Sequence, residues 1–426
     1  MYFFDDSSLP TVIIIGGGFG GLQLVKRLND KPYRVLLLDK HNYHTFQPLL
    51  YQIASAGISA DAIAFPFRRK IGPYPNIAFR MAEVTEVSPE NKIVHTNIGD
   101  FNYDYLIIAT GSETNYFGNT NLQKFGLPLK SIPDSLNLRS DILQEFETAL
   151  ITESIESRDR FLKFVIVGGG PTGVELAGAL AEIKKYVLPK DYTEIQKDRM
   201  HVILIEAGDR LLPPMSEKSS RLAKKYVEQL GVEVMLNTKV TDYDGEVITL
   251  GDGQKIESEN VIWTAGVKGA ALNGIPKELI VHGNRYKVDA FNRLEGYENI
   301  FAIGDIALMT ADPKYPKGHP GVAQAAIQQA KNLGKNFMRM HQKKELLPFR
   351  YHDKGSMATI GRHRAVVDLP FVSFGGYLAW YVWMFVHLMT LVGFRNRFMV
   401  FMSWMWNYFT YDRALRLIIR PYKRPE

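Results

Sequence analysis

The stretch VIIIGGGFGGLQLVKRL, residues 12–28, leads four aliphatic residues into closely spaced glycines and then into a helical pattern. A short buried strand that ends in GxGxxG and continues into a helix is typical of a dinucleotide-binding turn. Its first glycine permits the tight turn, the second lets the backbone approach a pyrophosphate, and the third lets the helix pack on the strand. We therefore expect a strand at 12–15, a helix at 22–28 and a second strand at 35–38, which ends at the ribose-binding candidate Asp39.

The same pattern returns as VIVGGGPTGVELAGAL at 165–180, so the chain has two predicted nucleotide sites. The next predicted strand, in HVILIEAG at 201–208, carries Glu206 at its end. Glu206 follows Gly168 by 38 residues, more than is usual, which predicts a lengthened helix and loop between them. A carboxylate there accepts both ribose hydroxyls and repels a 2′-phosphate, which favours NADH over NADPH. The alternative for Glu206 is a solvated carboxylate at a strand end.

Composition limits the chemistry. The chain has 426 residues, of which 46% are hydrophobic and 23% charged, as expected for a folded protein of two or three domains. It has no cysteine, which excludes disulfides, thiolate metal ligands, iron–sulfur clusters held by this chain and cysteine nucleophiles. We assign no metal site. The first residues, MYFFDDSSLP, lack the basic and apolar regions of a signal peptide, so we expect a protein that faces the cytosol.

Charge and aromatic residues concentrate near the C-terminus. The whole chain carries +6, and residues 395–426 contribute +5 of it, so the rest is close to neutral, which argues against nucleic acid as the partner of the main body. The stretch 371–394 has no charged residue and is long enough to span a bilayer, but glycines interrupt it and arginines follow it. Leucine and isoleucine at 415–419 alternate with Arg413, Arg416 and Arg420, which predicts a basic amphipathic helix. We favour a segment that lies in one leaflet; a buried dimer face is the alternative.

Three more strand-and-turn patterns follow the first: YDYLIIATGS at 103–112, NVIWTAGV at 260–267 and NIFAIGDIA at 299–307. With them the sequence resembles the flavoproteins with two dinucleotide-binding domains, in which FAD occupies the first and a nicotinamide nucleotide the second. This resemblance implies that the second domain is inserted into the first. It also implies that Thr110 and Asp305 lie at the FAD, and we expect a helix N-terminus after Asp305 to face the flavin.

Longer motifs resemble one family of these flavoproteins, the type II NADH:quinone oxidoreductases. They are DKHNYHTFQPLLYQIASAG (39–57), GGGPTGVELAGALAE (168–182), AQAAIQQ (323–329), DKGSMATIGRHRAVVD (353–368) and HLMTLVGFRNRF (387–398). The resemblance implies an α/β fold of two nested Rossmann-like domains with a C-terminal membrane-associating helical segment. It further implies hydride transfer from NADH to non-covalent FAD, electron transfer to a membrane quinone without proton pumping, a homodimer, and attachment to the cytoplasmic face of the inner membrane. The implied domains are 1–118 and 289–345 for FAD, 119–288 for NADH and 346–426 for the membrane.

The family's site residues carry over where the motifs match. For FAD they are Gly16, Gly18, Phe19, Gly20, Gly21, Asp39, Lys40, Thr110, Gly111, Asp305 and Lys354. For NADH they are Gly168, Gly170, Pro171, Thr172, Gly173, Glu175, Glu206, Ala265 and Gly266. For quinone they are Gln47, Pro48, Ala323, Gln324 and Gln328.

Glu175 is the catalytic candidate, because the resemblance places it near flavin and nicotinamide. Its alternative role is to stabilise a helix N-terminus. The alternative for Gln324 and Gln328 is simple solvation on an alanine-rich helix.

Two other functions use the same core. A reductase of a small redox protein would need a docking surface for its acceptor and no lipid. A membrane-bound NADH sensor would retain FAD without turnover. The sequence leaves the native quinone open between ubiquinone and menaquinone.

Overall fold

The computed structural model describes residues 8–410 and 415–424. These residues form two compact units. The first unit contains residues up to Thr45 together with 65–113 and 267–354, and the second contains 46–64, 114–266 and the described residues from Gly355 onward. Chain segments that are far apart in sequence therefore share a unit. The functional domains that the sequence predicts remain predictions.

The first unit is built on a five-stranded parallel sheet. Its order is β22 (Ile300–Ala302), β9 (Tyr105–Ile108), β1 (Thr11–Ile15), β2 (Arg34–Asp39) and β5 (Ile77–Met81). The strands are nearly continuous runs of buried aliphatic residues, as expected for a parallel sheet covered on both faces. Helix α1 (Phe19–Leu28) packs against α10 (Ala323–His341). The predicted strand, helix and strand at 12–38 are thus confirmed.

Smaller elements complete the first unit. The antiparallel sheet β6-β7-β8 spans Val84–Ser88, Ile93–Thr96 and Gly99–Asn102, and the sheet β20-β21-β23 spans Ile280–Val281, Arg285–Val288 and Ala307–Met309. Helix α3 covers Phe67–Ile71. The expected helix after Asp305 is wrong: a three-residue 3-10 turn, Gly304–Ile306, leads directly into β23, because these residues continue the sheet.

The second unit contains another five-stranded parallel sheet. Its order is β11 (Leu127–Pro128), β18 (Asn260–Trp263), β12 (Lys163–Val167), β13 (His201–Ile205) and β14 (Glu233–Met235). The antiparallel sheet β15-β16-β17 spans Val240–Tyr243, Val247–Leu250 and Lys255–Glu257. Helices of this unit include α2 (Leu50–Ala54), α4 (Thr120–Phe125), α5 (Ile132–Ile151), α6 (Ile155–Phe161), α7 (Pro171–Glu182) and α9 (Glu217–Gln229). A π-helical segment, Ile183–Val187, and α8 (Leu188–Asp191) prolong α7, as the long spacing to Glu206 predicts.

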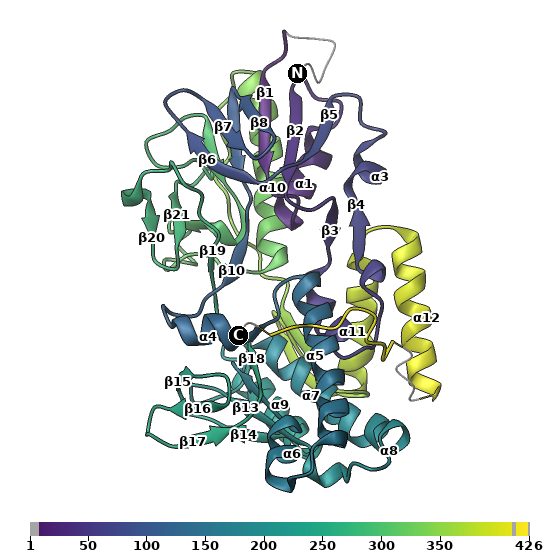
Figure 1. Ribbon diagram of the computed structural model, residues 1–426. Helices are drawn as coiled ribbons and strands as arrows, with labels where there is room; N and C mark the ends of the chain where they lie inside the picture. The colour runs from purple at the N-terminus through teal and green to yellow at the C-terminus, as the bar shows by residue number, and fades with distance from the viewer. Residues whose placement is uncertain (1–7, 411–414, 425–426) are drawn as a thin grey trace. The chain divides into compact units, whose positions relative to one another are not determined.

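The C-terminal part of the second unit begins with an antiparallel sheet of β24 (Ser356–Thr359), β25 (Ala365–Leu369) and β26 (Val372–Gly376). Two helices follow, α11 (Tyr377–Thr390) and α12 (Phe394–Thr410), which lie side by side as the yellow helices of Figure 1. The uncharged stretch 371–394 is therefore a strand and a helix, separated at Gly376 by a positive φ of 90°. Across the described ranges 8–410 and 415–424, no helix combines the length and apolar character needed to cross a membrane.

The predicted basic helix around residues 413–420 is wrong for the residues that the structure describes. Arg413 lies outside them, and residues 415–424 form no helix. Instead, Arg416 pairs with Asp191, and the Arg424 guanidinium donates to Asp141 at 2.7 and 2.8 Å. These ion pairs hold the end of the chain on the second unit, so two of its basic side chains are already neutralised by acidic partners.

Candidate functional site

The glycine turn of the first unit has the shape that a pyrophosphate requires. Gly16 has φ of +99°, and a Cβ there would lie 2.4 Å from the Ala109 carbonyl oxygen. A Cβ at Gly21 would lie 1.9 Å from the Gly16 oxygen, so only glycine lets α1 pack this closely. By contrast, a Cβ at Gly18 would have no neighbour within 4 Å. The turn thus leaves open space at the start of a ten-residue helix, where backbone N–H groups and the helix dipole favour a phosphate.

Asp39 stands at the end of β2 beside this turn. Its carboxylate accepts hydrogen bonds from Gly17 N–H at 2.6 Å and His41 N–H at 2.7 Å. Burial raises the pKa of Asp39, and the two backbone hydrogen bonds partly oppose that rise. The side chain therefore fixes the turn and lies where a ribose hydroxyl is expected.

The remaining FAD candidates lie in the same unit. Asp305 accepts a hydrogen bond from the Ser112 hydroxyl at 2.7 Å, while Thr110 donates to the Ala270 carbonyl at 2.8 Å. Gln329, buried on α10, accepts from Gly304 N–H at 2.7 Å and so holds the turn that carries Asp305. All predicted FAD residues, including Lys40, Gly111 and Lys354, thus belong to the first unit.

The second unit repeats the glycine turn. Gly168 has φ of +113°, and a Cβ there would lie 2.6 Å from Ala265 Cα. A Cβ at Gly173 would lie 1.9 Å from the Gly168 oxygen, whereas one at Gly170 would have no neighbour within 4 Å. Glu206 accepts from Gly169 N–H at 2.6 Å and from Gly208 N–H at 2.7 Å, as Asp39 does in the first unit. The whole predicted NADH set lies in this unit, with Pro171 and Thr172 in the first turn of α7.

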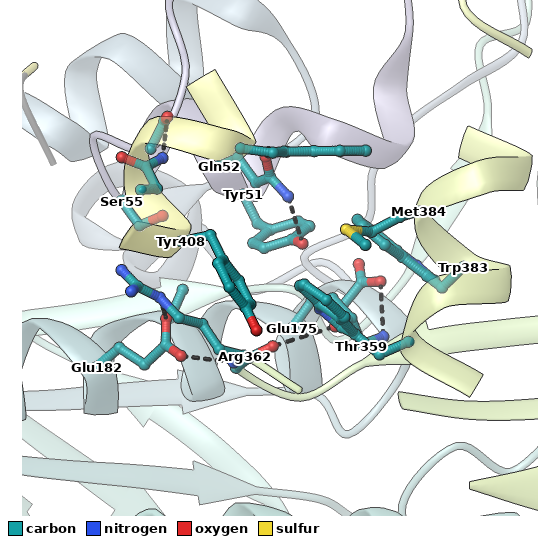
Figure 2. A pocket seen from close by; sticks show the side chains of 16 residues that line it. Tyr51, Gln52, Ser55, Glu175, Glu182, Thr359, Arg362, Trp383, Met384 and Tyr408 are labelled. Carbon is teal, nitrogen blue, oxygen red and sulfur yellow. Dashed lines mark hydrogen bonds and ion pairs between the residues drawn. The ribbon is translucent and has the colours of Figure 1, made fainter. Parts of the chain in front are cut away.

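A pocket of about 640 Å³, open mouth included, lies wholly within the second unit. Five parts of the chain line it: the segment around α2, α7, the β24–β25 turn, α11 and α12. The lining residues are Tyr51, Gln52, Ser55, Gly57, Glu175, Ala179, Glu182, Thr359, Gly361, Arg362, Trp380, Trp383, Met384, Trp404, Asn407 and Tyr408, and Figure 2 shows them around the cavity. Aromatic walls with a few polar groups suit a flat ring that carries carbonyl oxygens.

Glu175 is one of two buried carboxyl groups that line this pocket, with 7% of its surface exposed; Glu182 is the other. It accepts a hydrogen bond from Thr359 N–H at 3.4 Å. Burial raises the pKa of Glu175 to about 8, and the hydrogen bond from Thr359 opposes the rise only in part. At neutral pH the carboxyl group is therefore mostly protonated, which makes it a hydrogen-bond donor and a source of a proton.

The β24–β25 turn packs closely against α7. A Cβ at Gly178 would lie 2.7 Å from Gly361 N, so a side chain there would push the turn away. One helical turn further, Glu182 accepts from Arg362 N–H at 2.5 Å, and its second oxygen lies 3.9 Å from the Arg362 guanidinium. Glu175 and Glu182 lie on one face of α7, since residues seven apart lie on one side of a helix. Glu175 bonds to Thr359 at the end of β24, and Glu182 bonds to Arg362 in the turn that follows.

The predicted quinone residues are divided between the units. Gln47 and Pro48 belong to the second unit, and Ala323, Gln324 and Gln328 belong to the first. The Gln328 side chain exchanges hydrogen bonds with the backbone of His352, at 2.8 and 3.0 Å. Gln324 accepts from Lys354 N–H at 3.0 Å. The two glutamines therefore hold the segment 352–354, a role that the sequence did not reveal.

The sequence also missed most of the pocket. Tyr51 and Gln52 stand inside a motif that carries the family resemblance, and Trp383 and Trp404 belong to the aromatic cluster near the C-terminus. The sequence shows the motif and the aromatic cluster, but as two separate features. Only the fold shows that they meet around Glu175.

Comparison with known proteins first gives the class. The family model for pyridine nucleotide-disulphide oxidoreductases matches residues 10–330, and the NDH2 C-terminal domain matches residues 353–411. The structure of NDH2 from Plasmodium falciparum in complex with NADH has the same fold, with a TM-score of 0.89 at 24% identity over 96% of this chain and 100% of that chain. The fold is therefore that of an oxidoreductase with two Rossmann-type domains and a C-terminal domain, as predicted.

Curated relatives narrow the class. The type II NADH:quinone oxidoreductase Ndh of Mycobacterium tuberculosis is 36% identical over 412 residues, which cover 92% of this chain and 87% of the relative. The type II NADH:quinone oxidoreductase of Haemophilus influenzae is 29% identical, covering 85% of this chain and 87% of the relative. The chain belongs to the family of type II NADH:quinone oxidoreductases, which confirms the resemblance found in the sequence.

Proposed function

We propose that this protein is a respiratory flavoenzyme that oxidises NADH and reduces a membrane quinone by two electrons, without pumping protons. Family membership supports the reaction class. The observation that carries the proposal is the pocket of the second unit, where aromatic side chains surround the buried carboxyl group of Glu175, whose pKa is raised by burial. The absence of proton pumping rests on the family resemblance.

FAD is the cofactor that fits the first unit. The space at Gly18 suits its pyrophosphate, Asp39 suits its ribose, and Asp305 lies on a turn held by Gln329. When bound, FAD accepts a hydride from NADH and passes two electrons to the acceptor. The task of this chain is to bind both nucleotides and to exclude competing reactions.

NADH is the nucleotide that fits the second unit. The carboxylate of Glu206 lies beside the open space at Gly170, in the position of a ribose-binding acid. A 2′-phosphate at that position would meet a negative charge, which costs binding energy unless a cation compensates. We therefore propose a preference for NADH over NADPH.

Quinone binds, in this proposal, between Glu175 and the aromatic side chains of α11 and α12. A carbonyl oxygen of the quinone accepts a hydrogen bond from the protonated Glu175 carboxyl group. Reduction places negative charge on that oxygen, and the same carboxyl group supplies a proton there. Gln324 and Gln328 hold the segment 352–354, which includes Lys354, within the first unit, and a role for the two glutamines in quinone binding rests on the family resemblance.

The C-terminal helices support attachment to a membrane. Helix α12 turns its polar groups toward the protein: the Asn396 side chain donates to the backbone carbonyls of residues 61, 62 and 64, and Asn407 donates to the Gly57 carbonyl. Its opposite side and that of α11 expose large apolar side chains at helical spacing. These are Tyr377, Leu378, Tyr381, Phe385, Met389, Phe394, Phe398, Phe401, Met402, Met405, Trp406 and Phe409.

A surface helix of a water-soluble protein turns its apolar side toward the protein and its polar side toward water. Here the exposed side is apolar, which fits a helix that lies in a lipid interface. We propose peripheral attachment to the cytoplasmic face of the inner membrane, at an anionic surface. We also propose a homodimer, which rests on the family resemblance.

An anaerobic titration tests the function. Purified, yellow protein is first titrated with NADH and then with ubiquinone or menaquinone analogues. We expect NADH to bleach the flavin and quinone to restore it. Bleaching without reoxidation by any quinone would refute the proposed acceptor, and a flavin that NADH leaves unbleached would refute the enzymatic function.

A further inference from the structure

Three side chains in the wall of the pocket form a hydrogen-bonded chain. The Trp404 indole N–H on α12 donates to Gln52 Oε1 at 2.8 Å, and Gln52 Nε2 on α2 donates to the Tyr51 oxygen at 2.8 Å. All three residues line the pocket together with Glu175. Figure 2 shows the bond between Gln52 and Tyr51 directly.

The chemistry of the indole fixes the direction of this chain. An indole N–H donates and cannot accept, so it must face the carbonyl oxygen of the Gln52 amide. The NH₂ group of that amide then necessarily points toward Tyr51. The Tyr51 oxygen is thus an acceptor on the side of Gln52, and its own O–H is directed away from Gln52.

Tyr51 stands where its O–H can donate a hydrogen bond to a ligand in the pocket. It is buried, with 6% of its surface exposed, and it stands on α2, which packs against the helix α7 that carries Glu175. The pocket therefore has a phenol and a carboxyl group on two different helices. A quinone carbonyl is a hydrogen-bond acceptor that gains negative charge on reduction, so a fixed donor binds the reduced form more strongly.

We propose that Tyr51 donates a hydrogen bond to a carbonyl oxygen of the quinone, and that Gln52 and Trp404 are positioning residues that keep its hydroxyl pointed at the substrate. This inference rests on the proposed quinone function of the pocket. It assigns to α12 a second role, because the indole that directs the chain stands on the helix whose other side is apolar and exposed.

The proposal is tested by substitutions that keep the shape of a side chain but remove the Tyr51 O–H or change its direction. Tyr51→Phe removes the donor and is expected to lower kcat/KM for a soluble ubiquinone analogue by about 3- to 10-fold, the effect of one hydrogen bond. Gln52→Glu keeps Tyr51 but offers it a carboxylate, to which its O–H would turn, so we expect a similar loss. Gln52→Met removes the amide without capturing the hydroxyl, and we expect it to retain more quinone activity than Gln52→Glu.

The controls separate this role from folding. Tyr243→Phe removes another buried hydroxyl of the second unit, one that donates to the Gly245 carbonyl at 2.7 Å outside the pocket, and should leave quinone reduction unchanged. NADH-driven flavin reduction and the melting temperature are measured for every variant. Both should stay near wild type for Tyr51→Phe and Gln52→Glu.

Three outcomes would overturn the proposal for Tyr51. They are wild-type quinone kinetics in Tyr51→Phe and Gln52→Glu, an equal loss in Gln52→Met and Gln52→Glu, or a loss that follows the melting temperature. A wild-type protein that reduces a soluble dye but no quinone would instead refute the function on which the inference rests.

Discussion

Glu175→Gln is expected to change how the stability of this protein depends on pH. The pKa of the Glu175 carboxyl group is about 8 in the folded protein, against 4.5 as the ordinary value. Below about pH 4.5 both folded and unfolded states hold the proton. Between these values only the folded state retains it, so stability falls as pH rises.

The size of this effect follows from the two pKa values. Between pH 4.5 and about 8, the free energy of unfolding falls by about 1.4 kcal/mol for each pH unit. At pH 8 it is therefore about 5 kcal/mol lower than at pH 4.5. An amide cannot ionise, so Glu175→Gln removes this loss. The variant should be more stable than wild type at pH 8 and gain little or nothing at pH 4.5.

Urea unfolding followed by tryptophan fluorescence at several pH values between 5 and 8 measures this difference. Glu298→Gln, at an exposed carboxylate, is the matched control and should leave the pH dependence as it is in wild type. An equal pH dependence in Glu175→Gln and wild type would show that the carboxyl group is ionised in the folded protein. That result would remove the proton donor from the proposed mechanism.

Other predictions concern the nucleotide, the segment 352–354 and the membrane. Glu206→Gln should narrow the preference for NADH over NADPH by roughly tenfold, about 1.4 kcal/mol, in steady-state kinetics; equal use of both nucleotides by wild type would contradict the ribose assignment. Gln324→Ala removes the acceptor of Lys354 N–H, worth about 0.5 to 1.5 kcal/mol. It should speed hydrogen exchange at that amide and weaken quinone turnover while NADH-driven flavin reduction is retained, as rapid mixing would show; equal damage to both half-reactions would point to the fold. Phe398→Glu combined with Trp406→Glu should weaken binding to anionic vesicles, measured by sedimentation, by about 150-fold or more, because the two aromatic side chains together lose about 3 to 6 kcal/mol of burial; unchanged sedimentation would refute the lipid-facing assignment.

The nucleotide turns could be predicted from sequence because their causes are local. Gly16 and Gly168 adopt positive φ within a few residues of the strands that precede them, and the acids Asp39 and Glu206 follow at the end of the next strand. A pattern of strand, glycine turn and helix therefore carries most of the information.

The pocket could not be predicted in the same way because its contacts are not local. Gln52 and Trp404 are 352 residues apart, and nothing in either local sequence indicates their hydrogen bond. The tail shows the opposite failure: an alternation of leucine and arginine suggested a helix, but Arg416 and Arg424 find acidic partners on α8 and α5. Tertiary ion pairs here outweighed a short periodic pattern.

Photolabelling with an azidoquinone shows where the quinone binds without depending on turnover. Labelled protein in anionic vesicles is digested and its peptides are mapped, with and without excess unlabelled quinone. We expect labelling in residues 46–57 and 380–408, which form walls of the pocket around Glu175, and loss of that label under competition. Competed labelling confined to other segments would contradict the assignment of this pocket to quinone.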